Sequence, residues 1–197
     1  MRFYRFTRAL LRVLYRLFFR LEAKGKENVP DFGPVVLCAN HVSYFDPIAV
    51  GIPLKRKVHF MAKEELFSNT FLRKLLLLLG AFPVKRGGIS KESIRHSIEL
   101  LRNGNVMGIY PEGTTKGENG MGKKGAAMLA LRSKAVVIPV AVVGSFKLFK
   151  KVHIQYGPPV DIREFADGGS ENLEAATEKI MDVIREMVTS HKLLGKN

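Results

Sequence analysis

The sequence is poor in cysteine and in acidic residues, and each shortage excludes a class of protein. Cys38 is the single cysteine among 197 residues. An internal disulfide and a cysteine-based zinc site are therefore excluded, and a reducing compartment is the default. There are 18 acidic residues against 32 lysines and arginines, which gives a formal net charge of +14. A chain this basic indicates an anionic partner: nucleic acid, an anionic membrane surface or a phosphorylated substrate.

The apolar run Leu75–Val84 is too short to cross a bilayer. It has ten residues, about half of what a transmembrane helix requires. We predict a buried helix that runs into a strand; the alternative is a surface that dips into lipid. Hydrophobic residues make up 46% of the chain, which is enough to bury a core and excludes a disordered protein. The length suits one domain rather than two.

The positive charge is concentrated at the N-terminus in a helical rhythm. The first 20 residues contain six arginines, three or four residues apart, and no acid. At about 100° per residue, these arginines share one side of a helix. They are Arg2, Arg5, Arg8, Arg12, Arg16 and Arg20. Large apolar residues occupy the other side, namely Phe3, Phe6, Leu10, Val13, Leu14, Leu17, Phe18 and Leu21.

This pattern is typical of an amphipathic helix that lies on a membrane surface. We predict that residues 1–22 associate with anionic lipids and that residues 25–197 form one further domain. An arginine in every turn excludes a transmembrane span, and the absence of a small-residue cleavage site argues against a signal peptide. The alternative is a helix docked on the protein's own core with a solvated charged face.

Short apolar runs alternate with helical patterns along the rest of the chain. Continuous hydrophobicity within the runs favours strands that are buried on both faces. The alternation predicts a single α/β domain with a mostly parallel central sheet flanked by helices. The predicted strands are Val35–Ala39, Val58–Ala62, Ala81–Lys85, Val106–Tyr110, Val136–Val143 and Val152–Tyr156. The predicted helices are one opened by Asp46 and Pro47, Thr70–Leu79, one from a Ser90 cap to Gly104, Lys124–Ser133 and Ser170–Leu194.

Signals of other enzyme classes are weak. Residues 120–125 spell GxGxxG, but they do not directly follow a predicted strand and have no acid about 20 residues further on, so no dinucleotide site is predicted. Cys38 lies three residues before His41, but its apolar neighbours favour a buried core residue over a nucleophile. The other histidines show no metal-ligand spacing, and we predict no metal site.

His41 and Asp46 form the most informative pair in the sequence. The predicted strand delivers His41 to the carboxyl edge of the sheet, where open α/β folds bind their ligands. Asp46 follows five residues later, where the loop turns into a helix. That spacing lets the carboxylate hold one imidazole nitrogen and fix the tautomer, while the other nitrogen acts as a base. The alternative is a helix N-cap at Asp46 beside an incidental histidine.

Three further segments place charged residues or a proline at or just after predicted strands. Residues 80–87 put two cations, Lys85 and Arg86, just past a strand; the alternative is a solvated basic turn. Residues 109–114 put Glu112 after the next strand, where a carboxylate suits hydroxyl or backbone groups; the alternative is a turn alone, which would explain Pro111 and Gly113. Residues 136–140 carry Pro139 inside an apolar run, which indicates an edge position or a bulge near a site.

Taken in this order, the four segments resemble the glycerolipid acyltransferase family. Its blocks are H-x4-D, a basic block ending in Arg, E-G-T and V-P-V, and the resemblance runs from about Gly25 to Val160. It implies that His41 is the general base and that Asp46 is its partner. Relatives often continue E-G-T with Arg-Ser, whereas this chain has Thr and Lys at 115–116, which leaves the phosphate contacts open. The implied substrate-binding residues are Lys63, Arg86, Glu112, Gly113 and Thr114, with Pro139 shaping the pocket.

The resemblance implies direct transfer of a fatty acyl group from a thioester to the free hydroxyl of 1-acylglycerol 3-phosphate (lysophosphatidic acid). The product is phosphatidic acid, in phospholipid biosynthesis. The expected donor is acyl-CoA or acyl-carrier protein as co-substrate, with no cofactor, metal or protein nucleophile. We expect a peripheral protein on the cytoplasmic face of the cell membrane.

Two alternatives to this function stay open. Within the same reaction class, the acceptor is glycerol 3-phosphate or another lysophospholipid. From a different class, the chain is a basic nucleic-acid-binding protein. We expect no nucleic-acid partner, because the sequence lacks a basic recognition helix, an RNA-binding aromatic motif and a zinc finger.

Overall fold

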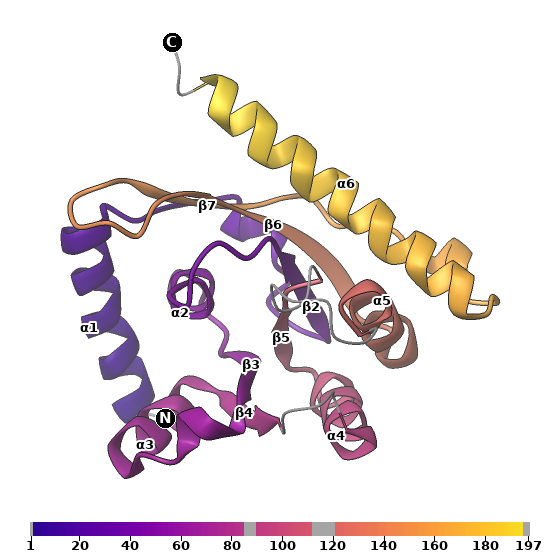
Figure 1. The fold of residues 1–197 in the computed structure, drawn as a ribbon, viewed down its shortest axis with the longest axis horizontal. Helices are drawn as coiled ribbons and strands as arrows, with labels where there is room; N and C mark the ends of the chain where they lie inside the picture. Colours follow the sequence, from indigo (N-terminus) through magenta and orange to yellow (C-terminus); the bar gives the residue numbers. More distant parts are fainter. Residues whose placement is uncertain (1, 85–89, 112–120, 195–197) are drawn as a thin grey trace.

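A seven-stranded sheet forms the middle of the molecule, between two layers of helices (Figure 1). The computed structural model describes residues 2–84, 90–111 and 121–194. The strands are β1 (Glu22–Lys24), β2 (Val35–Ala39), β3 (Val58–Lys63), β4 (Ala81–Val84), β5 (Val106–Ile109), β6 (Val136–Gly144) and β7 (Val152–Tyr156). The helices are α1 (Arg2–Phe19), α2 (Asp46–Gly51), α3 (Thr70–Leu79), α4 (Lys91–Arg102), α5 (Met121–Ser133) and α6 (Ser170–Leu194).

The strand order is β1-β7-β6-β2-β5-β3-β4. Among the described strands, neighbours run parallel except β6 and β7, which are antiparallel. This arrangement confirms the predicted α/β domain with a mostly parallel sheet. It places β2, which leads into the His41 loop, in the centre of the sheet.

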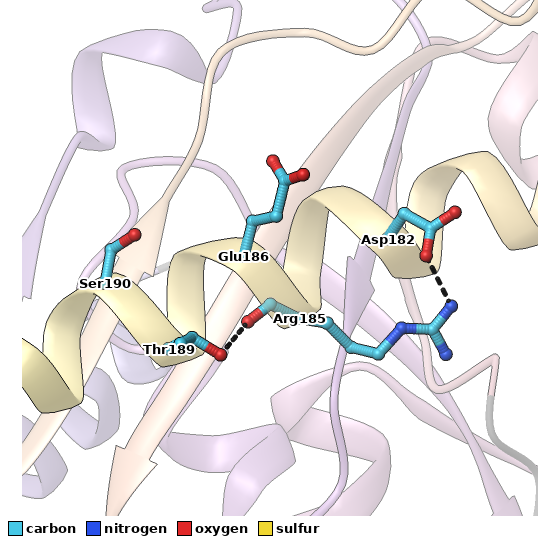
Figure 2. A pocket seen from close by; sticks show the side chains of 5 residues that line it. All are labelled: Asp182, Arg185, Glu186, Thr189 and Ser190. Carbon is cyan, nitrogen blue, oxygen red and sulfur yellow. Dashed lines mark hydrogen bonds and ion pairs between the residues drawn. The ribbon is translucent and has the colours of Figure 1, made fainter.

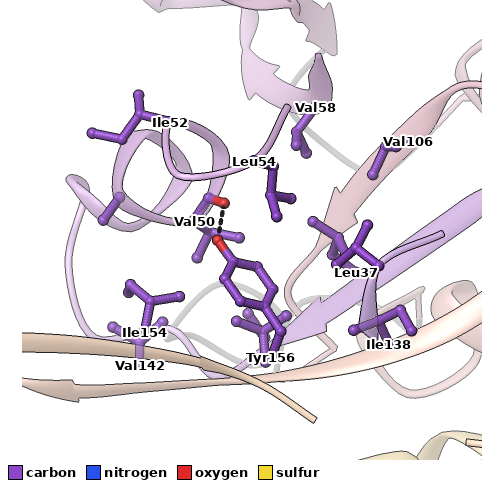
Figure 3. Packing of buried hydrophobic residues seen from close by; sticks show 14 of the residues in the cluster. Leu37, Val50, Ile52, Leu54, Val58, Val106, Ile138, Val142, Ile154 and Tyr156 are labelled. Atoms are coloured by element: carbon purple, nitrogen blue, oxygen red, sulfur yellow. Dashed lines mark hydrogen bonds between the residues drawn. The ribbon is translucent and has the colours of Figure 1, made fainter. Parts of the chain in front are cut away.

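Strand β2 shows why both faces of the sheet are covered by helices. All five of its residues are buried. Val35 and Leu37 pack into a cluster with α2 and α1, whereas Val36 and Cys38 pack into a second cluster with α4, α5 and α6. Figure 3 shows the first cluster, in which the Tyr156 hydroxyl donates to the Val50 carbonyl oxygen at 2.7 Å. A strand that is apolar at every position therefore marks a sheet buried on both sides.

Helix α3 has the predicted boundaries but not the predicted burial. The Asn69 side chain caps it by accepting from the backbone N–H groups of Phe71 and Leu72, each at 3.0 Å. Gly80 ends it with a φ of 100°, and a Cβ there would lie 2.7 Å from the Val58 carbonyl oxygen. The structure describes all ten residues of α3, and none of them is buried. The prediction of a buried helix is therefore wrong, and Phe71 is 79% exposed.

Helix α1 docks on the domain by one of its sides. Tyr15 is only 5% exposed and belongs to the core cluster. Arg8 donates to the carbonyl oxygens of Leu54 at 2.8 Å and Lys55 at 2.6 Å, and Arg12 donates to that of Ile52 at 2.7 Å. Two of the six arginines thus bind backbone of the domain. A second side of the helix remains exposed, with Phe3, Phe6, Leu10, Val13 and Leu17.

Two details of the sheet differ from the sequence expectations. Strand β1 was not predicted; it forms an edge of the sheet by pairing with β7. Pro139 does not lie on an edge strand, because β6 runs between β2 and β7. The Pro139 carbonyl oxygen accepts from the Gly157 N–H at 2.8 Å, one residue past the end of β7. The proline nitrogen faces the same side as its carbonyl oxygen, towards β7. The regular β6–β7 pairing ends at Val140 and Tyr156, so the missing N–H of Pro139 removes no hydrogen bond between the two strands.

Candidate active site

The loop after β2 is fastened to β6 before it reaches His41. The Asn40 side chain donates to the Val142 carbonyl oxygen at 2.9 Å and accepts from the Val142 N–H at 2.7 Å. These two bonds continue the β2–β6 pairing by one residue through a side chain. Asn40 therefore fixes the point from which His41 leaves the sheet. The sequence offered one signal for this role, namely its position directly before His41.

Asp46 is fully buried and all its described hydrogen bonds converge on one oxygen. Its Oδ2 lies 2.7 Å from His41 Nδ1 and accepts from the backbone N–H groups of Val42 at 2.7 Å and Ser43 at 2.8 Å. A buried carboxylate needs such donors to offset the loss of hydration. The loop between the two residues thus curls around the carboxylate, and the five-residue spacing brings the pair together as predicted.

His41 lies between the buried carboxylate and the outside of the molecule. Its side chain is 31% exposed, whereas that of Asp46 is 0% exposed. The carboxylate accepts from Nδ1, which assigns the proton to that nitrogen and makes Nε2 the proton acceptor. The imidazole also stacks on the Tyr110 ring, with centroids 4.3 Å apart and planes 26° apart. Both contacts help to set the orientation of the imidazole.

Tyrosines close the site from behind. Burial raises the pKa of Tyr110 well above its ordinary value, and the negative charge of Asp46 raises it further. The same two causes raise the pKa of Tyr15, which comes from α1. Both phenols therefore stay neutral near Asp46 at neutral pH. Neither tyrosine was selected from the sequence, although Tyr110 lies within residues 109–114, the segment that carries Glu112.

Cys38 does not take part in the chemistry as a nucleophile. It is fully buried in the cluster under α4, α5 and α6, on the face of the sheet away from α2. Burial raises the pKa of its thiol to about 12. Because the thiolate is the reactive form of cysteine, this thiol is inert near neutral pH.

The other residues predicted for the site divide into two groups. Lys63 is exposed at the carboxyl end of β3, and Pro139 is buried within β6. The segments that carry the remaining residues follow β4 and β5, which end at Val84 and Ile109. Those remaining residues lie outside the described part of the chain: Arg86, Glu112, Gly113 and Thr114, together with residues 115–116.

A hollow elsewhere on the surface is unrelated to this loop. It measures about 520 Å³, and its lining residues all come from α6, from Asp182 to Ser190 (Figure 2). Arg185 there pairs with Asp182 at 2.8 Å, and the Thr189 hydroxyl donates to the Arg185 carbonyl oxygen at 2.9 Å. Side chains of one helix cannot enclose a ligand, so this is a helix surface rather than a site. Across residues 2–84, 90–111 and 121–194, no three His, Cys, Asp or Glu side chains gather as metal ligands would.

Fold and pair together define a class of protein. A histidine held by a buried carboxylate at the carboxyl edge of a parallel sheet is an arrangement that can supply a general base in an α/β enzyme. A family model described as Acyltransferase matches residues 20–143, which include both His41 and Asp46. The chain belongs to the acyltransferase family, and it is an enzyme of that class.

Similar proteins share both the sequence and the fold. Over 191 residues the chain is 35% identical to the 1-acyl-sn-glycerol-3-phosphate acyltransferase of Bacillus subtilis, covering 93% of this chain and 96% of the relative. The enzyme of the same name from Borreliella burgdorferi is 27% identical over 182 residues, covering 86% of this chain and 72% of the relative. The crystal structure of the 1-acyl-sn-glycerophosphate (LPA) acyltransferase PlsC from Thermotoga maritima matches with a TM-score of 0.71 and 26% identity, covering 92% of this chain and 76% of that one.

Proposed function

We propose that this protein transfers a fatty acyl group from a thioester to the free hydroxyl of 1-acylglycerol 3-phosphate, giving phosphatidic acid. The observation that carries the proposal is the 2.7 Å contact between His41 Nδ1 and the buried Asp46 carboxylate, in a chain of the acyltransferase family. The names of the Bacillus subtilis and Borreliella burgdorferi relatives support this acceptor. Glycerol 3-phosphate or another lysophospholipid is the alternative acceptor.

The proposed reaction is a direct transfer. His41 Nε2 accepts the proton of the acceptor hydroxyl as that oxygen forms a bond with the thioester carbonyl carbon. The carbon–sulfur bond then breaks, and the proton passes from His41 to the leaving thiolate. Asp46 holds the imidazole and stabilises its positive charge while it carries the proton. Base catalysis of this kind typically contributes about 10²–10⁴-fold to the rate.

The proposed acceptor site lies beside His41 on the side of β5, β3 and β4. Lys63, at the carboxyl end of β3, has an exposed ammonium group suited to a phosphate. The segments after β4 and β5 supply the other proposed acceptor contacts: Arg86, Glu112, Gly113 and Thr114. The mechanism calls for no metal and no cofactor, since the donor, acyl-CoA or acyl-carrier protein, is itself a co-substrate.

We further propose that the enzyme works as a peripheral protein on the cytoplasmic face of the cell membrane, bound to anionic lipids. In the described part of the chain, no helix combines the length and the apolar composition needed to cross a bilayer. Instead, α1 exposes an apolar stripe, flanked by exposed arginines such as Arg5 and Arg16, and contacts α3, which exposes Phe71 and Leu77. Exposed apolar side chains next to cations suit the interface of an anionic bilayer. The apolar stripe is Phe3, Phe6, Leu10, Val13 and Leu17.

The proposed function is tested with the purified protein and vesicles of anionic phospholipid. Acyl-CoA and acyl-carrier protein are each supplied with lysophosphatidic acid, with glycerol 3-phosphate and with a neutral lysophospholipid, and products are identified by mass spectrometry. We expect phosphatidic acid as the main product. Reactions without an acceptor control for hydrolysis of the thioester. Acylation of glycerol 3-phosphate or of the neutral lysophospholipid in preference to lysophosphatidic acid would contradict the proposed acceptor, and no acyl transfer at all would contradict the reaction.

A further inference from the structure

A cavity of about 230 Å³ lies directly beside the His41 loop. One wall belongs to this loop, through Val42 and Ser43, and the other belongs to the connection between β6 and β7. In the wall formed by the His41 loop, the backbone N–H of Ser43 donates to the Asp46 carboxylate at 2.8 Å. The cavity therefore lies next to the loop that holds the His41–Asp46 pair, and two of its lining residues, Val42 and Ser43, directly follow His41 in that loop. Its lining residues are Val42, Ser43, Gly144, Ser145, Phe146 and Lys147.

The wall formed by the β6–β7 connection is held in place by several contacts. Gly144 starts the turn with a φ of 113°, and a Cβ there would lie 2.3 Å from the Lys151 carbonyl oxygen, so only glycine fits. The Phe149 N–H donates to the Phe18 carbonyl oxygen at 2.6 Å. The Phe146 ring packs edge-on against Phe19, with centroids 5.4 Å apart. The cavity is thus built by a braced loop.

The groups that line the cavity suit a polar, anionic chain. Ser43 and Ser145 bring hydroxyl groups, and Lys147 brings a cation on an exposed side chain. Among the described residues that line the cavity, Val42 and Phe146 alone have apolar side chains. A fatty acyl chain is poorly matched to such walls, whereas a slender arm of amides and hydroxyls that ends in a phosphate is well matched.

The position of the cavity separates it from the proposed acceptor site. Strands β5, β3 and β4 lie on one side of β2, and the segments that carry the proposed phosphate contacts follow β4 and β5. Strand β6 lies on the other side of β2, and the cavity is at its carboxyl end. His41 therefore stands between two regions, as a base must when two substrates meet at one nitrogen.

From this juxtaposition we propose that the cavity receives the phosphopantetheine arm of the acyl donor, with Lys147 at the phosphate and the serines along the arm. This inference rests on the proposed function, since it takes a thioester as the donor. Coenzyme A and acyl carrier protein present the same arm, so the site serves either source. The arm brings the thioester carbonyl to His41 from the side opposite the acceptor phosphate. When the carbon–sulfur bond breaks, the thiol leaves along the same cavity with the proton from His41.

The test compares Lys147→Ala with Lys150→Ala in the full-length protein on vesicles that contain lysophosphatidic acid. Lys150 is an exposed lysine of the same connection that does not line the cavity. Three donors are used: acyl-CoA, acyl-carrier protein and S-acyl phosphopantetheine. Loss of a charge-assisted contact is expected to raise the donor KM about tenfold for Lys147→Ala. The acceptor KM and kcat stay within about twofold of wild type. Lys150→Ala is expected to resemble wild type in every parameter.

A second measurement separates failure of this inference from failure of the proposed function. Binding of a non-reactive thioether analogue of acyl-CoA is measured by calorimetry, which needs no turnover. The inference expects weaker binding for Lys147→Ala and for Ser145→Trp, which fills the cavity, and unchanged binding for Lys150→Ala. In the kinetic comparison, a rise in the acceptor KM of Lys147→Ala would overturn the inference. A rise in the donor KM for acyl-CoA alone would also overturn it, since it would place Lys147 at the nucleotide of coenzyme A. Normal analogue binding by both cavity variants would also overturn it, whether or not the wild type transfers acyl groups.

Discussion

The two helical layers differ in what they offer to their surroundings. On α6, the buried side carries Ala176, Ile180 and Ile184, while the outer side carries acids paired with Arg185. Helix α1, on the other layer, exposes large apolar side chains next to arginines and includes no acid. The outer surface of the α4, α5 and α6 layer suits contact with water. The layer of α1, α2 and α3 instead leaves large apolar side chains exposed.

The proposed chemistry lies in the layer that exposes large apolar side chains. Asp46 is the first residue of α2, and His41 stands in the loop that leads to it. The aromatic cluster of Tyr15, Phe19 and Phe45 joins α1 to the residue directly before Asp46. One layer thus combines the proposed catalytic pair with an exposed apolar surface, and the other supports the sheet. Substitutions in the two layers should therefore have different effects.

Apart from replacement of His41 itself, the largest effect is expected for Asp46→Asn. The amide keeps the shape of the carboxylate but loses its charge and offers His41 the wrong hydrogen-bond partner. We expect the rate of acyl transfer to fall by about 10²–10⁴-fold. Asp182→Asn on the outer side of α6 is the matched control, and its rate should stay within about twofold. Rates are measured on folded protein, checked by circular dichroism; equal losses in both variants would refute the division between the layers.

The reverse outcome is expected for Ile180→Ala in the supporting layer. Ile180 is fully buried under α6, and removing its side chain leaves a cavity that lowers the free energy of unfolding by about 2–5 kcal/mol. The rate per folded molecule should not change. Urea unfolding supplies the free energy, with Leu10→Ala on the exposed side of α1 as a control that changes it by less than about 0.5–1 kcal/mol. A specific loss of catalysis in folded Ile180→Ala would show that this layer is more than a support.

A smaller effect is expected when the exposed stripe of α1 is made polar. Replacing Phe3, Phe6, Leu10 and Leu17 by serine should weaken binding to anionic vesicles by at least about tenfold, even at low salt, since each apolar side chain contributes about 1.5–3 kcal/mol when fully buried. The double variant Arg5→Gln and Arg16→Gln should weaken binding mainly at low salt. At high salt the charges of these arginines are already screened in the wild type, so their removal changes little. Sedimentation with vesicles measures both. Asp182→Ser with Glu186→Ser on α6 is the control, and a similar loss there would contradict a membrane role for α1.

The smallest effect is expected for alkylation at Cys38. Its thiol is buried and has a pKa of about 12, so it stays protonated and inaccessible at neutral pH. Treatment of the folded protein with iodoacetamide should leave the rate of acyl transfer unchanged, and mass spectrometry should show no adduct. An adduct formed in parallel with inactivation would instead assign Cys38 to the active site.

Much of the fold was predictable because local signals agreed with tertiary packing. Strand β2, helix α3 and helix α6 have the predicted boundaries, since the apolar runs of β2 and α3 and the 25-residue amphipathic pattern of α6 are strong local signals. Strand β1 was missed because three residues with two exposed side chains carry too weak a pattern. The burial of α3 was overestimated because apolar sequence alone does not tell protein core from an exposed apolar surface.

The site was predictable in its pair but not in its surroundings. The five-residue spacing was enough to bring His41 to Asp46, because a loop of that length curls around one carboxylate oxygen. The contacts of Asn40 and Tyr110 depend on strands distant in sequence, so local patterns did not reveal them. The same holds for Arg8 and Arg12, whose carbonyl partners lie 40 to 47 residues away.

The most direct test of the account is the rate of acyl transfer to lysophosphatidic acid by His41→Ala, measured on vesicles beside the wild type. His41 is partly exposed and lies in a loop, so the variant should fold and bind vesicles as the wild type does. We expect a rate at least about 10²-fold lower than that of the wild type, with unchanged vesicle binding. A folded, vesicle-bound His41→Ala protein that turns over at a near-normal rate would contradict this expectation.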